Sequence, residues 1–587
     1  MTFSLLYYPW LVLKVILLIS APILTYGLLW FINLVFIKPL FDPLRNIPGP
    51  NGAKFESHIP QVMDPDITPG VYNEWRKRYG PTFRFHGFGK HDYRLLSFDK
   101  VTIYHVLTKP MYEKPWQTRR FLGRIIGRGI FSMEGDEHKA QRKIVLTAFK
   151  KESISAMMPT FLNKAEELAA RWKEELHKTE DKASNTVDIA HWVSRATFDV
   201  MGMVGFEYDF HALEDESEEV YSAYRRMFSI VDKGMGLWDV LELYLPWLRK
   251  IFVTDDIKTT NECLEVIERA GKDIIARKKA ALDSFLLPKQ RQADLLTLLI
   301  KENKIACADE QLSDRDLLDQ CSTFLLAGAD TLSVALSWCI HLLSQHADVQ
   351  SRLRKEIHKV YIPRDTDLSD ESDDSGYQEC TKCTGHGMFA CRCTSENRSQ
   401  ILWDAVLKLP YLDAVIHEAL RLSPPAHGTI RVATQDDMLP ISEPLVMSDG
   451  TVKAKGQVDY IKIKKGSYIH IPIEGINHDE DRWGTDALLF NPERWQKEER
   501  HKSESMSLNV GHRNLMTFGY GQHMCVGAKL SITAMKIFLV VLLSEFDFEP
   551  ASDVTIAKCN TILTRPIIKG KWSAGTQLPI QIRTLSK

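Results

Sequence analysis

One cysteine lies in a glycine-rich loop that directly precedes a predicted helix. The loop reads FGYGQHMCVGAKL, with Cys525 between Gly521 and Gly527. A cysteine just before a helix has its thiolate favoured by the helix dipole and by unpaired N–H groups. Because glycine has no Cβ, this backbone is also able to approach a flat and bulky group. The loop indicates a thiolate that is a metal ligand or a nucleophile, and a buried structural cysteine is the alternative.

Four other cysteines crowd together in ECTKCTGHGMFACRC. They are spaced as Cys380-x-x-Cys383 and Cys391-x-Cys393, with His386 as a further candidate ligand. Four thiolates are able to hold zinc in a tetrahedral site. The first half resembles one repeat of the zinc-binding region of DnaJ chaperones, but the second half lacks its two-residue spacer. A metal site, a reduced surface loop and a segment absent from the functional protein all remain open.

A long apolar pattern begins at the predicted cap Ser313 and continues through DRDLLDQCSTFLLAGADTLSVALSWCIHLLSQ. Since it is apolar almost all round, we expect this helix to cross the interior. In the middle of the pattern Gly328 and Thr331 favour a local kink, because the threonine hydroxyl is able to bond back to the helix. An unpaired Asp330 would be costly in such a helix, which favours a functional acid there.

Four motifs of one protein family occur in this chain, in the order in which that family has them. Phe518, Gly521, Cys525 and Gly527 match the F-x-x-G-x-R-x-C-x-G signature of the cytochrome P450 family, whose cysteine is the axial ligand of haem iron. AGADT resembles the oxygen-activation motif of that family, EALR its E-x-x-R motif and PERW its P-E-R-F segment. The resemblance covers almost all of the chain after Pro48. It implies a mainly α fold with small β-sheets.

The resemblance also implies roles for individual residues. Haem b would be the cofactor, with Cys525 as the thiolate ligand of the iron, and Thr331 and Asp330 would position water and deliver protons. A buried charge triad would fix the fold behind the haem. Its members are Glu418, Arg421 and Arg494.

Further residues are predicted to contact the haem propionates. His523 stands where the family usually has an arginine, and the charge of a histidine depends on pH. His138 and Arg142 in EHKAQRK, and Arg431 in HGTIRVA, match other propionate-binding positions of the family. The guanidinium group of an arginine is able to donate two parallel hydrogen bonds to a carboxylate. For each arginine, an ordinary surface position is the alternative.

The N-terminal part is predicted to anchor the chain in a membrane. Residues 15–37 carry no charge and would span roughly 34 Å as a helix. A cleaved signal peptide is the alternative, but its apolar region is shorter. Lys38, Arg45 and Lys54 follow the span while Lys14 precedes it, so the rest of the chain is expected on the cytoplasmic side. IPGP, at 47–50, is expected to be a stiff hinge.

Two domains follow from these patterns. Residues 1–50 form the anchor and hinge, and residues 51–587 form a haem-binding monooxygenase domain with a low-complexity insertion at about 365–400. Alternation in VDYIKIKKGSYIHIPI predicts a strand pair that turns near Gly466. Phe121 and Ile125, in an expected loop, and Phe324, one turn before AGADT, are candidate pocket residues, with plain core as the alternative.

The predicted function is haem-thiolate monooxygenation of a lipophilic small molecule, such as a terpenoid or another secondary metabolite. Only 60 residues follow Gly527, too few for a flavin domain, so electrons are expected from a separate NADPH-cytochrome reductase on the endoplasmic reticulum. The net charge of -2 gives no reason to expect nucleic acid. The alternatives are a haem-thiolate isomerase or dehydratase, and a metal-binding interaction protein on an inactive haem fold. The microsomal pattern resembles fungal members of the family.

Overall fold

A computed structural model describes twelve stretches of the chain. These stretches are residues 7–52, 57–63, 68–178, 185–232, 242, 244–245, 247–283, 294–306, 311–361, 405–454, 456–496 and 515–585. They divide into two compact units, each built from two segments of the chain. Unit 1 consists of residues 1–113 and 430–472, and unit 2 consists of residues 114–429 and 473–587.

Unit 1 contains most of the strands. One sheet has the order β1-β2-β10-β5-β3, and two smaller sheets pair β6 with β9 and β7 with β8. Its helices are α1 (Tyr7–Ile32), α2 (Ile59–Met63), α3 (Thr68–Tyr79) and α4 (Lys100–Thr108). Its strands are β1 (Thr82–His86), β2 (Tyr93–Ser97), β3 (Tyr112–Glu113), β5 (Thr429–Ala433), β6 (Asp437–Ile441), β7 (Leu445–Val446), β8 (Val452–Lys453), β9 (Asp459–Ile463) and β10 (Tyr468–Ile471).

The expected strand pair near Gly466 is wrong in its pairing. Both strands form, and Gly466 lies between them with a φ of +89°. However, β9 pairs antiparallel with β6, and β10 pairs parallel with β2. Alternation in a sequence predicts that two strands exist, but the partner of each strand is chosen by side-chain packing on the whole sheet.

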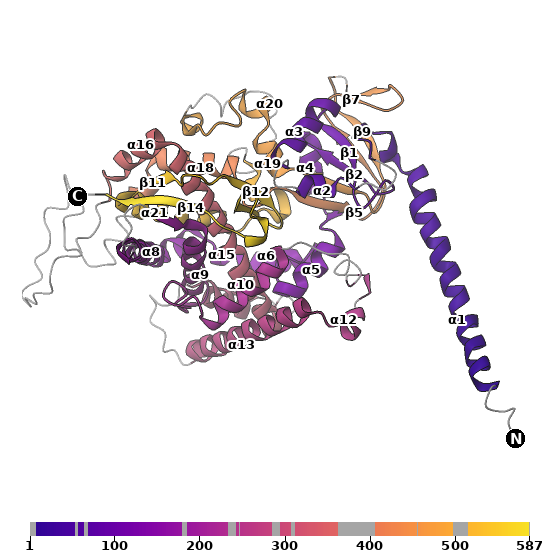
Figure 1. The fold of residues 1–587 in the computed structure, drawn as a ribbon, viewed down its shortest axis with the longest axis horizontal. Helices are drawn as coiled ribbons and strands as arrows, with labels where there is room; N and C mark the ends of the chain where they lie inside the picture. The colour runs from indigo at the N-terminus through magenta and orange to yellow at the C-terminus, as the bar shows by residue number, and fades with distance from the viewer. Residues whose placement is uncertain are drawn as a thin grey trace, which may run out of the picture. The chain divides into compact units, whose positions relative to one another are not determined.

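The helix α1 projects away from the strands of its own unit (Figure 1). An apolar stretch over Ser20–Phe41 overlaps the predicted span at 15–37, and none of its most apolar window is buried. The IPGP segment that follows is not a free hinge. Leu44 and Ile47 are buried, and the carbonyl of Pro48 accepts a 2.8 Å hydrogen bond from the Arg84 amide of β1.

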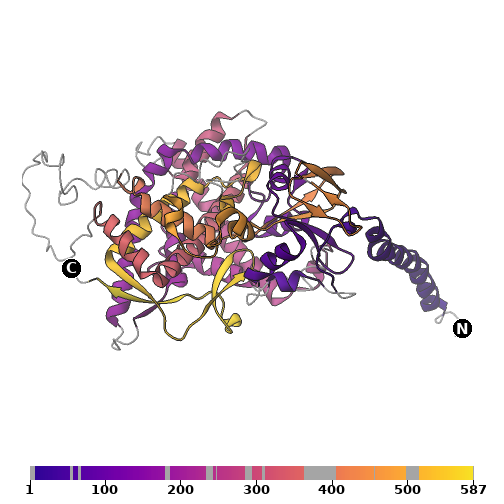
Figure 2. The same ribbon diagram turned by 90° about the horizontal axis from the view of Figure 1, so that it is seen from above.

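Unit 2 is mainly helical, as the sequence predicts. Its helices are α5 (Trp116–Ile126), α6 (Gly135–Ala148), α7 (Lys151–Ala156), α8 (Met158–Lys178), α9 (Ile189–Phe206), α10 (Glu219–Asp232), α12 (Leu248–Ile251), α13 (Asp255–Asp283), α14 (Leu295–Ile305), α15 (Asp314–Gln345), α16 (Ala347–Ile357), α18 (Pro410–Leu422), α19 (Ile473–Asn477), α20 (Glu480–Trp483) and α21 (Ala528–Glu545). Its strands are β4 (Thr186–Asp188), β11 (Phe546–Pro550), β12 (Ile556–Asn560), β13 (Thr564–Ile568) and β14 (Pro579–Thr584). Figure 2 shows the C-terminal strands in yellow along one edge of these helices.

The long interior helix α15 organises unit 2. Ser313 caps it, accepting a hydrogen bond from the Asp316 amide at 3.2 Å, while the Asp316 carboxylate accepts one from the Ser313 amide at 2.9 Å. This reciprocal capping box fixes where the helix begins. Within its most apolar window, 78% of α15 is buried, and it packs against α9 (Figure 1). Although α15 is long and apolar enough for a membrane, it is a core helix.

The helix α5 corrects one expectation from the sequence. Phe121 and Ile125 lie in this helix and not in a loop. Leu122, Ile125 and Ile126 are buried, with the three- and four-residue spacing of one helix face. Several arginines on the other positions obscure this pattern in the sequence.

Candidate functional site

The loop around Cys525 is built by two short 3₁₀ turns, Met516–Phe518 and Gly521–His523. Gly519 and Gly521 have φ angles of +70° and +72°, which favour glycine. The Cys525 amide donates a 2.9 Å hydrogen bond to the carbonyl of Phe518 and closes the loop. Glycine is therefore required at 519 and 521 by the backbone conformation of the turns, whether or not a bulky ligand binds nearby.

The Cys525 thiol combines an exposed surface with enclosed surroundings. Its side chain is exposed, yet burial is the largest cause that raises its pKa. The Gly527 amide, at the N-cap of α21, and the charge of Arg142 lower the pKa by smaller amounts. The predicted helix-start effect is present but weaker than burial. Because the side chain is exposed, a ligand is able to reach this sulfur, as a metal ligand requires.

Arg142 and His138 lie four residues apart on α6. Among the residues that the structure describes, half-buried Arg142 has no hydrogen bond or ion pair with a side chain or backbone group. Burial lowers its pKa, and the nearby Cys525 raises it. His138 is buried, and its ring centroid lies 4.1 Å from that of His523. An enclosed guanidinium without a protein acceptor, next to the cysteine, fits a carboxylate of a bound group.

His523 forms a closed ring with Lys114 and Glu134. Its Nε2 lies 2.7 Å from Glu134 Oε2, and its Nδ1 lies 3.2 Å from Lys114 Nζ. Lys114 Nζ lies 3.1 Å from Glu134 Oε1 and also donates to the Met133 carbonyl at 3.3 Å. All three side chains are nearly buried, with exposed fractions of 12%, 5% and 13% for Lys114, Glu134 and His523.

The middle of α15 interrupts an otherwise buried helix. Ala327 is exposed, and the Thr331 hydroxyl donates a 2.5 Å hydrogen bond to its carbonyl, the back-bond expected from the sequence. Close packing on α9 explains the glycine at position 328, because a Cβ there would lie 2.5 Å from the Met201 side chain. The helix thus keeps α9 close, while exposed Ala327 and half-buried Thr331 leave an opening in its cover.

Asp330 has a partner that the sequence did not reveal. Arg565 on β13 donates to both of its oxygens, from Nη1 to Oδ1 at 3.0 Å and from Nη2 to Oδ2 at 2.7 Å. Both side chains are largely buried, with exposed fractions of 9% for Asp330 and 12% for Arg565. A two-pronged ion pair of this kind fixes the direction of a carboxylate.

The predicted triad of Glu418, Arg421 and Arg494 forms a buried network. Glu418 Oε1 lies 2.8 Å from Arg421 Nη2 and 3.0 Å from Arg494 Nε. The Trp495 indole donates to Glu418 Oε2 at 2.8 Å. Burial alone raises the pKa of Glu418, but Arg421 and Arg494 outweigh it and the pKa is lowered. The triad joins α18 to the 3₁₀ turn at Pro492–Trp495.

Arg431 is a residue of β5 in unit 1, where its Nη1 donates to the Ile430 carbonyl at 2.9 Å. Phe324 of α15 packs edge to face on Phe149, with ring centroids 5.9 Å apart. A Cβ on Gly527 would lie 3.7 Å from the same Phe149 ring. Phe149 therefore lies between the cysteine loop and α15.

Three residues of the site were missed by sequence reasoning. Lys114, Glu134 and Arg565 belong to no motif, and each acquires its role from a partner far away in the chain. One indication of them is present in the sequence: a buried Asp330 would be costly without a partner, which predicts a nearby cation but does not identify it. Cys380, Cys383, Cys391 and Cys393, together with His386, lie outside the described residues. Within the described part, no group of three candidate metal ligands occurs.

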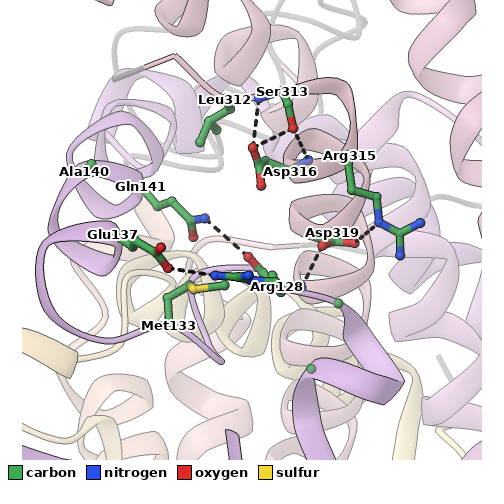
Figure 3. Close-up of a pocket in the computed structure, with 12 residues that line it drawn as sticks. Arg128, Met133, Glu137, Ala140, Gln141, Leu312, Ser313, Arg315, Asp316 and Asp319 are labelled. Carbon is green, nitrogen blue, oxygen red and sulfur yellow. Dashed lines mark hydrogen bonds and ion pairs between the residues drawn. The ribbon is translucent and has the colours of Figure 1, made fainter. Parts of the chain in front are cut away.

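A pocket of about 510 Å³ lies between α6 and the start of α15 (Figure 3). Its polar lining is already paired internally: the Arg128 guanidinium donates to Glu137, its amide donates to Asp319, and Arg315 contacts Asp319. None of the predicted site residues lines it. The chemistry indicated by the motifs therefore lies elsewhere.

Comparisons with known proteins agree with these motifs. The family model described as cytochrome P450 matches residues 47–375 and 392–573. Cytochrome P450 monooxygenase 205 of Postia placenta is 31% identical, over 94% of this chain and 95% of that protein. Cytochrome P450 monooxygenase claQ of Ampulloclitocybe clavipes is 29% identical, over 92% and 93%. A ganoderic acid synthetase of Ganoderma lucidum is 29% identical, over 89% and 91%. The predicted resemblance to fungal members of the family is confirmed.

Proposed function

Because the chain belongs to the cytochrome P450 family, we propose that it is a membrane-anchored haem-thiolate monooxygenase that oxidises a lipophilic small molecule. The chain is an oxidoreductase of the monooxygenase class, and the family implies a haem cofactor, O2, a substrate and a redox partner. The proposal adds haem b, the roles of individual residues and the membrane.

The observation that carries the proposal is the exposed Cys525 side chain, with Arg142 close enough to lower its pKa and, within the described part of the chain, without a protein partner of its own. Cys525 would hold the haem iron, and Arg142 would hold a propionate, with His138 close by on α6. When bound, the haem supplies the oxidising chemistry, and the thiolate increases its ability to cleave O2. Phe518, Gly521 and Gly527 shape the loop that presents the sulfur. Arg431 remains a proposed second propionate ligand.

Proton control is assigned to Thr331 and Asp330. The Thr331 hydrogen is used on the Ala327 carbonyl, so its oxygen is left to accept a hydrogen bond from a water at the opening. Asp330 is held by Arg565 from β13. In this arrangement Thr331 would order water, and the Asp330 carboxylate, held in one direction by Arg565, would accept a proton from solvent water and pass it on to that ordered water.

The substrate is proposed to be a terpenoid or another secondary metabolite. One relative carries the name ganoderic acid synthetase, which supports a small organic metabolite as the substrate class. Phe121, Ile125 and Phe324 are the proposed apolar contacts. Phe121 and Ile125 come from α5, and Phe324 from α15.

The setting is proposed to be the endoplasmic reticulum membrane with the catalytic part on the cytoplasmic side. An exposed apolar helix and the cations Lys38 and Arg45 after it support this orientation. A separate NADPH-cytochrome reductase on the same membrane would supply the electrons.

The test is the absorption spectrum of the reduced protein with carbon monoxide. We expect a Soret band at the long wavelength typical of thiolate ligation, and its loss in Cys525→Ser. The matched control is Cys380→Ser with Cys383→Ser, which should keep the band. A folded protein without haem, or with a band typical of neutral ligation, would refute the proposal.

Oxygen consumption separates the proposal from its rivals. With reductase and NADPH, a monooxygenase consumes O2 and forms product that contains an atom of it. A haem-thiolate isomerase or dehydratase would give product without that atom. Binding of zinc by the wild type but not by the Cys380 and Cys383 variant, with no turnover of any substrate tested, would instead favour the metal-binding alternative.

A further inference from the structure

The ring of Lys114, Glu134 and His523 uses all the polar atoms of the histidine. A carboxylate only accepts hydrogen bonds and an ammonium only donates them. Nε2 of His523 therefore donates to Glu134 Oε2 at 2.7 Å, and Nδ1 accepts from Lys114 Nζ at 3.2 Å. Neither nitrogen is left to donate to a carboxylate of a bound group. This differs from the role that an arginine at position 523 would have.

Lys114 is equally committed within the protein. Its ammonium contacts His523, Glu134 and the Met133 carbonyl, which match its three hydrogens. The positive charge of Lys114 is balanced by Glu134 inside the ring. Arg142, in contrast, has no such partner among the described residues.

The ring joins three separate segments of unit 2. Lys114 precedes α5, Glu134 is the N-cap residue of α6, and His523 ends the 3₁₀ turn two residues before Cys525. The His523 ring also packs on His138 of α6, with centroids 4.1 Å apart. The contacts of His523 with Glu134 and His138 hold the cysteine loop to α6, which carries Arg142, and Lys114 connects both to the segment before α5.

We propose that the Lys114–Glu134–His523 ring is a lock that positions the Cys525 loop against α6, and that His523 acts through this lock and not as a direct propionate ligand. The inference rests on the proposed haem-binding function. The lock would keep the sulfur and the Arg142 guanidinium at a fixed separation, so that one haem is held by both.

Burial makes the lock stiff. Breaking a nearly buried ion pair leaves the other charge without compensation. The low pKa of Glu134 agrees with tight pairing: burial raises it, but the hydrogen bond from His523 and the charge of Lys114 outweigh burial and lower it to about 2. The Lys114 amide adds a 3.0 Å hydrogen bond to Glu134 Oε1.

The experiment uses Glu134→Gln and Lys114→Met in the full-length protein. We expect each to transfer haem to excess apomyoglobin about tenfold faster than the wild type or more, since each leaves a buried charge unpaired. Part of the carbon monoxide band should move to the position of neutral ligation, because a loose loop no longer holds the sulfur on the iron. The matched control is Asp136→Asn on the first turn of α6, whose side chain is 97% exposed; it should behave as the wild type.

The double variant distinguishes a lock from general destabilisation. If the two charges act as one unit, Glu134→Gln with Lys114→Met should lose haem more slowly than the product of the two single effects predicts. It also serves if one single variant fails to fold. Haem retention and band position equal to those of Asp136→Asn in both single variants would overturn the lock. A wild type without a thiolate band would instead refute the proposed function itself.

Discussion

The carboxylate of Glu418 is the most enclosed charge among the motif residues. Its exposed fraction is 0%, and so is that of Arg421. Arg421 additionally donates to the carbonyls of Asn477 and Ala487 at 2.7 and 2.6 Å. The triad therefore ties the E-x-x-R helix to backbone in two later segments, and its role is to hold the fold rather than to react.

Glu418→Gln should lower the free energy of unfolding by about 3–5 kcal/mol at pH 7, because Arg421 and Arg494 are left buried without a counter-charge. The folded pKa of Glu418 is below the ordinary value of 4.5. Its stabilisation is thus present above about pH 4.5 and is lost as the pH falls through the folded pKa. Thermal unfolding from pH 7 to pH 4 should show the gap between variant and wild type narrowing on acidification.

The control for this prediction is an exposed ion pair. Glu175→Gln removes the partner of Lys178 on α8, where the exposed fractions are 41% and 68%. Pairs of that kind contribute at most about 1 kcal/mol. A loss in Glu418→Gln as small as in this control would show that the triad is not an energetic unit.

At the residue scale, the sequence indicated the residues of the motifs but not the distant residues that contact them. The Cys525 amide closes its own loop, the Thr331 hydroxyl bonds back to its own helix, and Glu418 pairs with Arg421 three residues away, so each motif fixes a local conformation or a short-range pair. Lys114 and Arg565 meet their partners across 409 and 235 residues. No local pattern encodes such contacts, since they are set by the packing of whole elements.

At the scale of elements, the strength of the pattern decided what could be predicted. The helix α15 begins at its predicted cap Ser313, because capping box and apolar run agree. The strands β9 and β10 form where predicted but choose β6 and β2 as partners. Alternation alone carries no information about which edge a strand joins.

The contact between α15 and β13 yields a prediction at the same scale. Arg565→Gln removes the cation that directs Asp330 and should reduce product formed per NADPH oxidised, by about tenfold for a residue that positions a carboxylate in a proton relay. Arg565→Lys keeps the charge but not the two-pronged geometry, so it should recover only part of the yield. Product and NADPH are measured in the same reaction with reductase.

The matched control for Arg565 is an arginine on the nearby strand β14. Arg583 is 59% exposed, and Arg583→Gln should leave the product yield unchanged. If Arg565→Gln lowers the rate of NADPH oxidation but not the yield per NADPH, Arg565 does not act through the proton relay. A thermal unfolding curve for each variant shows whether the folded protein is being compared.

At the scale of the whole molecule, the two units draw on distant parts of the chain. Unit 1 combines residues 1–113 with 430–472, and unit 2 combines the remainder. The sequence predicted an anchor followed by one large domain. That domain organisation stays a prediction. The boundary between the two units, near β5, is not marked by a change of composition, because sheets such as the one that joins β2 to β10 combine distant parts of the chain.

The end of the anchor can be located by truncation. Phe41 is 69% exposed, whereas Leu44 and Ile47 are buried at 0% and 1%, and the Pro48 carbonyl is bound to β1. Removal of residues 1–41 should therefore release the protein from membrane vesicles without altering its carbon monoxide band. Removal of residues 1–50 should also release it, but should lower the free energy of unfolding by about 2–5 kcal/mol, because two buried side chains and a backbone hydrogen bond are lost.

Sedimentation with vesicles measures the release from the membrane, and thermal unfolding measures the loss of stability. If the shorter truncation still sediments with the vesicles, a surface other than α1 holds the protein to the membrane. If both truncations unfold at the same temperature, residues 42–50 do not stabilise unit 1.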